Sequence, residues 1–179
     1  MAFPRPRKTG SENELYDYAI GALGRRMRSV AELKRLLRPR VDANTEYGQT
    51  LVELVIRRLK DNGYLNDAKY AAAYSSFRRE NEKFGRMRVI TDLKAKGVHG
   101  EVIETAVNSV YEDISDEKLA RDYLRRKRLV KPKDRKQSAR IFRQLTRAGF
   151  TSKTIFAILK KWEVDDETLA ALEEASETG

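Results

Sequence analysis

The sequence lacks the residues from which most catalytic and metal sites are built. Its 179 residues include no cysteine and one histidine, His99. A disulfide framework, a thiolate zinc site and a histidine metal cluster are therefore excluded. No nucleophile or general acid–base arrangement can be assembled from the remaining residues, so we expect no enzyme activity, no cofactor and no metal.

Nucleotide-binding glycine motifs and long apolar runs are also missing. The ten glycines form neither a P-loop nor a dinucleotide-binding motif. Residues 97–100 are similar to the short loop of KH domains, but that loop needs neighbouring strands, and no period-two run predicts one. We expect His99 to be a turn or capping residue at the start of a helix. No apolar run approaches the roughly 18 residues of a membrane span, and residues 1–10 lack a signal peptide's apolar core, so we expect a cytoplasmic protein without membrane contact.

The most informative pattern present is an internal repeat. One set of residues recurs 52 positions later in the same order: Val89, Leu93, Gly97, Val98 and Ile103 match Ile141, Leu145, Gly149, Phe150 and Ile155. A looser copy precedes both, with Leu33 and Leu37 in the first two places and Val41 where the others have glycine. Repeats of about fifty residues are typical of stacked arrays whose neighbours complete one another's cores.

Each repeat is predicted to contain three helices. Capping residues at Ser11, Ser29, Ser115, Asp134 and Thr151 mark helix starts, and Asn62-Gly63 ends a helix that begins near Leu51. Tyr70, Tyr74 and Phe77 lie at helical spacing and are expected in the core. We therefore predict an all-α fold, an elongated array of three tandem three-helix repeats. Its expected parts are a disordered basic arm over 1–10, repeats over 11–65, 66–114 and 115–162, and an acidic tail over 163–179.

Charge is distributed unevenly. The net charge is +10, and residues 118–161 carry sixteen Lys or Arg against two Asp. Solvated helix faces usually mix signs more evenly, so this block is expected to attract a polyanion, either nucleic acid or an acidic protein surface. Residues 163–179 carry seven acids and no base. Within them 166–175 could form a short helix, which either folds over the basic block as a competitor or remains a solvated end.

Basic residues cluster at the same point of each repeat, the junction between its first two helices. If the repeats stack, these clusters form a positive stripe suited to a phosphate backbone or a filament groove. Phe84 lies among them and could stack on bases. The candidate binding residues are Arg25, Arg26 and Arg28 in the first junction; Arg78, Arg79, Lys83, Arg86 and Arg88 in the second; and Arg125, Arg126, Lys127, Arg128, Lys131, Lys133, Arg135 and Lys136 in the third.

Over residues 14–162 the motifs together resemble the bacterial RecX family. These motifs are Tyr18-Ala19 with Arg25-Arg26 and Ser29-x-x-Glu32-Leu33, the segment from Leu59 to Asp67, Tyr70-Ala71-x-x-Tyr74, Phe84-Gly85-x-x-Arg88, and Leu93-x-Ala95-Lys96-Gly97-Val98. The resemblance implies a regulator that lies along the groove of RecA–DNA filaments and restrains filament growth, strand exchange, ATP turnover and coprotease action in DNA repair and the SOS response. The expected partners are the RecA filament and, non-specifically, single- and double-stranded DNA, with the protein a monomer. The long turn of the first repeat and the acidic tail depart from the family pattern.

Two other classes of protein compete with this interpretation. A tandem helix-turn-helix DNA-binding protein would use the same glycine turns, but a recognition helix needs basic or amide side chains at its start. The second repeat has Glu101 and Glu104 there, so only Lys153 and Lys160 of the third repeat fit. A plain helical scaffold would explain the repeats but not three basic junctions.

Overall fold

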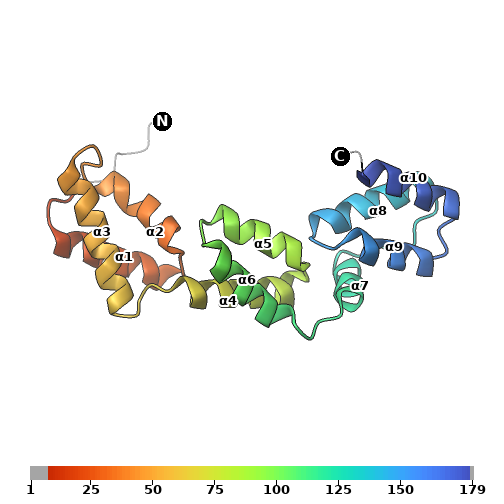
Figure 1. The fold of residues 1–179 in the computed structure, drawn as a ribbon, viewed down its shortest axis with the longest axis horizontal. Helices are drawn as coiled ribbons and strands as arrows, with labels where there is room; N and C mark the ends of the chain where they lie inside the picture. The colour runs from red at the N-terminus through yellow and green to blue at the C-terminus, as the bar shows by residue number, and fades with distance from the viewer. Residues whose placement is uncertain (1–7, 178–179) are drawn as a thin grey trace. The chain divides into compact units, whose positions relative to one another are not determined.

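A computed structural model describes residues 8–177, and every regular element in that range is helical (Figure 1). The all-α prediction is confirmed. The ten α-helices and one short 3-10 helix are α1 (Glu12–Arg25), α2 (Val30–Leu37), η1 (Arg38–Arg40), α3 (Glu46–Asp61), α4 (Asp67–Glu82), α5 (Arg86–Ala95), α6 (Gly100–Tyr111), α7 (Asp116–Arg126), α8 (Arg135–Arg147), α9 (Ser152–Lys161) and α10 (Asp166–Glu177). No described helix is long and apolar enough to cross a membrane. Residues 1–7 of the predicted arm lie outside the described range, and the Thr9 amide donates to the Arg40 carbonyl (2.7 Å).

Local capping chemistry sets most of the helix starts. The side chains of all five predicted caps accept a hydrogen bond from the backbone amide three residues later, which satisfies an amide that the helix cannot pair. The third helix is the exception to the predicted bounds, because α3 begins at Glu46 and not near Leu51. Thr45 caps it through the Gly48 amide (3.1 Å). Residues 46–50 are therefore helical, although the polar stretch 42–50 was expected to form the long turn of the first repeat.

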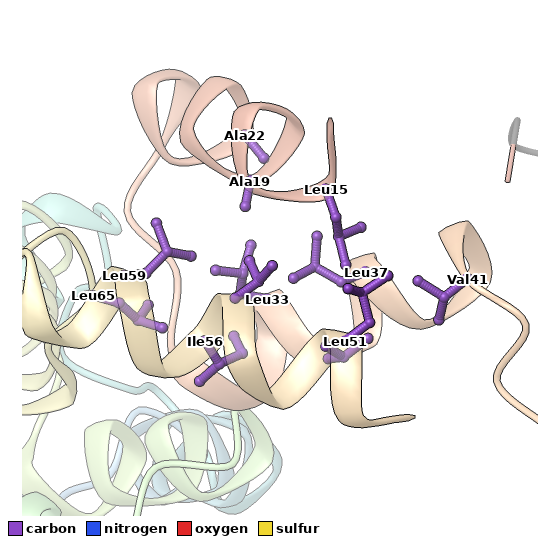
Figure 2. Packing of buried hydrophobic residues seen from close by; sticks show 12 residues of the cluster. Leu15, Ala19, Ala22, Leu33, Leu37, Val41, Leu51, Ile56, Leu59 and Leu65 are labelled. Carbon is purple, nitrogen blue, oxygen red and sulfur yellow. The ribbon is translucent and has the colours of Figure 1, made fainter. Parts of the chain in front are cut away.

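Close packing divides the described chain into two compact units, residues 8–71 with 93–103, and residues 72–92 with 104–177. In the first unit, apolar side chains of α1, α2 and α3 point toward one another and form a core (Figure 2). Leu15, Leu33, Leu37, Val55 and Leu59 are fully buried there. Each buried side chain of this size stabilises the fold by about 1.5–3 kcal/mol.

In the second unit, α7, α8 and α9 bury one apolar face each. The residues that face inward include Leu119, Tyr123, Ile141, Leu145 and Ile155. The acidic helix α10 belongs to the same core, because its Leu169 and Leu172 are buried and it packs on α8 and α9. The short helix predicted for this segment is therefore present, and its apolar side anchors it.

The aligned positions of the repeat are buried as predicted. Val89, Leu93, Ile141, Leu145 and their partners Leu33 and Leu37 are at most 5% exposed. Phe77 contradicts the prediction for its stripe, since it is 55% exposed, whereas Tyr70 of the same face is buried. Ala71 and Ser75 are fully buried, so the packed side of α4 is centred on these small residues and faces away from Phe77. The aromatic spacing alone therefore does not identify the side of α4 that packs.

The two repeat glycines do more than turn the chain. In the first unit, Ser29 Oγ donates to the Lys96 carbonyl (2.6 Å), and a Cβ on Gly97 would lie 2.5 Å from Ala31 Cβ. In the second unit, the Gly85 amide donates to the Ala148 carbonyl (2.8 Å), and a Cβ on Gly149 would lie 2.2 Å from the Arg88 nitrogen. The start of the second helix of one repeat thus contacts the glycine turn of the next repeat twice, at equivalent positions. We call this contact the glycine joint.

Candidate functional site

The first basic junction lies between α1 and α2. Arg25 ends α1 and is exposed, and Arg26 forms an ion pair with Glu32 (3.7 Å). Arg28 turns back, so that its Nε donates to the Ala22 carbonyl (3.5 Å). Two of the three arginines therefore contact their own helices, and Arg25 is the most available for a partner.

Glu32 connects this junction to the glycine joint. Its carboxylate accepts from the Ser29 amide (3.1 Å), completes a reciprocal capping box at the start of α2, and pairs with Lys96 (3.2 Å). Burial raises the pKa of Glu32, but the Ser29 hydrogen bond and the Lys96 ammonium outweigh burial, and the net pKa lies below its usual value. Glu32 is charged in the folded protein and helps to hold the joint together.

The second junction is built around Asp92, whose side chain is only 15% exposed. Arg78 Nη2 (2.8 Å), Arg88 Nε (3.0 Å) and the Tyr74 hydroxyl (3.1 Å) all contact its carboxylate. The guanidinium of Arg78 also lies over the Phe84 ring, 4.6 Å from its centroid. Burial, partly offset by Arg78, raises the pKa of Tyr74 to about 12, so the tyrosine remains a neutral donor to Asp92.

The remaining cations of the second junction also have partners. Arg79 donates to the Val110 carbonyl (2.5 Å) and pairs with Glu80, and Arg86 donates to Asn108 Oδ1 (3.1 Å). Lys83 has a φ of 57° and turns the chain after α4. Most of this junction therefore stabilises the packing of its own unit, and Phe84, which packs on Tyr123 with ring centroids 6.2 Å apart, is not a free stacking platform.

The third junction adjoins the second within the same unit, because Arg126 pairs with Glu82 at the end of α4 (3.0 Å). Its other cations are more available. Arg125 is 80% exposed, and among residues 8–177 its one ion pair is with Asp122, three positions earlier. Arg128 is exposed in the turn after α7. Lys127 lies near the Tyr123 ring (5.9 Å).

Four more predicted cations follow along the loop and the start of α8. Lys131 pairs with Glu163 (2.7 Å), where the hydrogen bond holds the pKa of the glutamate below its usual value. Lys133, Arg135 and Lys136 are exposed. The third junction therefore presents the densest accessible positive charge among the predicted sites.

Three further arginines on α8 lie outside the predicted set of site residues. Arg140, Arg143 and Arg147 are exposed, and within residues 8–177 they form no ion pair. Their spacing from Lys136, at steps of four, three and four, is the signal that could have identified them, because it places all four cations on one helix face.

The other candidate functional groups are metal ligands and the single histidine. No group of three or more His, Asp or Glu side chains lies close enough to hold a metal ion in this part of the chain. His99 is exposed and precedes α6, and its carbonyl accepts the Ile103 amide (3.0 Å), which is the helix-start role predicted for it.

Comparison with known proteins gives a consistent result. The family model described as "RecX, second three-helix domain" matches residues 66–107. A protein named Regulatory protein RecX from Myxococcus xanthus is 33% identical over 169 residues, which cover 88% of this chain and 87% of the relative. The protein of the same name from Bacillus subtilis is 31% identical over 155 residues, covering 85% of this chain but only 56% of that longer relative.

Solved structures agree on the fold. A crystal structure of RecX from Lactobacillus salivarius superposes with a TM-score of 0.65 at 20% identity, covering 85% of this chain and 96% of the other. A second crystal structure of a regulatory protein RecX gives 0.64 at 21% identity. The family model matches the second three-helix domain, and a relative that is 33% identical aligns over most of both chains. This chain therefore belongs to the RecX family of regulatory proteins.

Proposed function

We propose that this chain binds RecA and RecA–DNA filaments and restrains filament growth, strand exchange, ATP turnover and coprotease action. In this proposal it works as a monomer in the cytoplasm, in DNA repair and the SOS response. The observation that carries the proposal is the accessible positive charge of the third junction, in a chain whose relatives are named regulatory proteins. A filament of protein on DNA is a long polyanion, and exposed guanidinium groups suit both phosphate and carboxylate partners.

Accessible cations outside the third junction would add to its contacts. Once the third junction is bound, Arg25 of the first junction binds at a high effective concentration, so affinity for a filament exceeds affinity for free RecA or bare DNA. Contacts to DNA itself would be electrostatic and weakly dependent on sequence, because phosphate contacts carry no base information.

A tandem helix-turn-helix protein acting directly on DNA is less well supported. The first turns of α6 expose Glu101 and Glu104, whose carboxylates would face phosphates. Only α9, with Lys153 and Lys160 exposed, offers basic side chains in the equivalent helix. One helix of this kind does not make a tandem reader.

The test is ATP turnover by RecA on single-stranded DNA, with this protein added at substoichiometric levels. We expect slower turnover with the wild type and weaker inhibition with the double variant Arg125→Gln, Arg128→Asn. Arg126 is left in place because replacing it would break its ion pair with Glu82. Asparagine is chosen at 128 because φ is 54° there, and asparagine tolerates that region best among side chains of suitable polarity.

The control variant removes the same charge elsewhere. Arg57→Gln with Lys60→Gln takes two exposed cations from α3 and should inhibit RecA as the wild type does. Both variants should keep their stability within about 1 kcal/mol, since exposed charges contribute little. RecA turnover that is unchanged by equimolar wild type would show the proposal to be wrong, and equal inhibition by the double variant would show that the third junction is not the working surface.

A further inference from the structure

The exposed side of α8 is an uninterrupted row of cations. Lys136, Arg140, Arg143 and Arg147 are all exposed. At 100° per residue they fall within a sector of about 60°, and at 1.5 Å per residue they span about 16 Å. The buried residues Ser138, Ile141, Phe142 and Leu145 occupy the opposite side of the helix. We call the row the α8 cationic face.

Nothing in the described chain neutralises this face. The thirteen residues of α8 include no Asp or Glu, and the four cations form no ion pair within residues 8–177. The acidic helix α10 packs on α8 through its apolar side and leaves the row uncovered, since all four side chains stay exposed. Like charges four apart on a helix destabilise it, and Lys136 lies in the first turn, where the helix dipole disfavours a cation. The face is thus costly in the free protein and is relieved by an anionic partner.

Three kinds of partner carry negative charge, and the face fits one of them. A protein interface usually centres on buried aromatic or aliphatic anchors, and a membrane-binding helix inserts apolar side chains beside its cations. The α8 cationic face exposes neither, since its apolar residues all point into the core. Three guanidinium groups in a row with no apolar anchor are the arrangement that follows a phosphate backbone.

We propose that the α8 cationic face binds the sugar–phosphate backbone of nucleic acid. The inference deepens the proposed function by assigning the DNA contact to one helix face, three of whose cations lie outside the predicted junctions. It rests on that function only for its biological setting, because the binding can be tested on DNA without RecA.

The first experiment measures the salt dependence of binding. Wild type and the triple variant Arg140→Gln, Arg143→Gln, Arg147→Gln are titrated onto a labelled oligothymidylate and onto a labelled duplex by fluorescence anisotropy. The slope of log K against log salt is negative, and each lost phosphate contact makes it less steep by about 0.7 on single strands or 0.9 on duplex. We therefore expect the magnitude of the slope to decrease by about 2 to 3, and affinity at 0.1 M salt to fall on the order of a hundredfold. The larger loss identifies the preferred form of DNA.

The control separates a local face from overall attraction. Arg57→Gln, Lys60→Gln, Lys94→Gln removes the same three charges from exposed positions on α3 and α5. We expect the slope of log K against log salt for this variant to differ from that of the wild type by no more than the value of about one phosphate contact. Equal losses in both triple variants would mean diffuse attraction by net charge and would overturn the proposal.

A single reversal keeps the test independent of folding. Lys136→Glu places a carboxylate in the first turn of α8, four residues before Arg140, where the helix dipole and the new pair both favour it. We expect its melting temperature to be equal to or above that of wild type while its DNA affinity falls at least tenfold. A variant that is more stable yet binds less cannot be explained by unfolding.

Each of the other possible outcomes either supports or overturns the proposal. Wild type that fails to bind DNA, or a triple variant that binds DNA like wild type, would overturn the proposal. So would a triple variant that loses only RecA inhibition, or only binding to phosphatidylserine vesicles, since either would identify a different partner. Loss of DNA binding with intact RecA inhibition would support the proposal and would show that the regulatory activity does not need this contact.

Discussion

Replacing Gly149 by alanine should be among the most damaging small changes to this protein. Gly149 has a φ of 92°, a region that costs a residue with a Cβ about 1–2 kcal/mol. The added methyl would also lie 2.2 Å from the Arg88 nitrogen and 2.8 Å from the Gly85 carbonyl oxygen, both backbone atoms. Because no side chain can rotate away, the backbone itself must move.

That movement breaks the glycine joint of the second unit. The hydrogen bonds from the Gly85 amide to the Ala148 carbonyl (2.8 Å) and from the Met87 amide to the Gly149 carbonyl (3.3 Å) would be stretched, at about 1 kcal/mol each. Together with the φ cost, we expect Gly149→Ala to lower the free energy of unfolding by about 3–4 kcal/mol. Small domains are stable by about 5–15 kcal/mol in total, so the effect is easily measured by urea unfolding followed by circular dichroism.

Two other glycines supply the comparison. Gly63 has a φ of 75° but nothing within 4 Å of its added Cβ, so Gly63→Ala should cost only about 1–2 kcal/mol. Gly97→Ala meets the Ala31 side chain at 2.5 Å, and Ala31→Gly should therefore rescue part of its cost in a double-mutant cycle. The reasoning is refuted if Gly149→Ala costs no more than Gly63→Ala, or if Ala31→Gly gives no rescue.

Three further predictions follow from contacts described above. Leu93→Asp and Leu145→Asp, both fully buried and equivalent in the repeat, should each destabilise by several kcal/mol in thermal melts, and near-wild-type melting of both would contradict the repeat alignment. Tyr111→Phe removes the hydrogen bond from the tyrosine hydroxyl to the Phe84 carbonyl (2.8 Å) and should cost about 1–2 kcal/mol in urea unfolding, whereas Phe77→Ser, on an exposed side chain, should cost about 0.5 kcal/mol or less. The pKa of Glu32 is lowered in the folded state, so its charged form stabilises the protein at pH values above the ordinary pKa of 4.5. This contribution is lost as the pH falls through the lower pKa of the folded state. Glu32→Gln should therefore be less stable than wild type at pH 7 in urea unfolding, and the difference should shrink below pH 4.5.

The helices were predictable because their signals are local. Ser29, Ser115 and Asp134 cap helices within three residues of themselves, and the buried faces follow from apolar spacing along one element. The start of α3 was misplaced because Thr45 lies inside a polar stretch whose composition resembles a turn.

The glycine joint could not be predicted from the same signals. A glycine in a turn predicts a positive φ. The reason that no Cβ fits at Gly97, however, is its contact with Ala31, which lies more than sixty residues away in the sequence. The ion pairs of the second junction could not be predicted either, because they also depend on how the helices pack. The sequence shows Arg78 and Arg88 as two cations, whereas the fold places both on Asp92.

The α8 cationic face is a different case, because its signal was present in the sequence. Arg140, Arg143 and Arg147 lie within a helix and not at a junction between helices, so the pattern of basic junctions does not include them. Counting them at helical spacing identifies the face directly.

The glycine joint also affects the order in which the chain can fold during synthesis. Ser29 is hydrogen-bonded to Lys96, 67 residues later, and the first compact unit includes Leu93–Ile103. A ribosome that has made α1, α2 and α3, down to Leu65, has therefore not yet supplied the segment that covers Ser29 and Ala31. At about 5–20 residues per second, the chain waits roughly 2–8 s for that segment, with a helix end uncovered. Each joint uses a segment of the next repeat, so a compact unit can finish folding only after part of the following repeat has been synthesised. We therefore expect chains stalled near Leu65 to be more susceptible to proteolysis than chains stalled after Ile103.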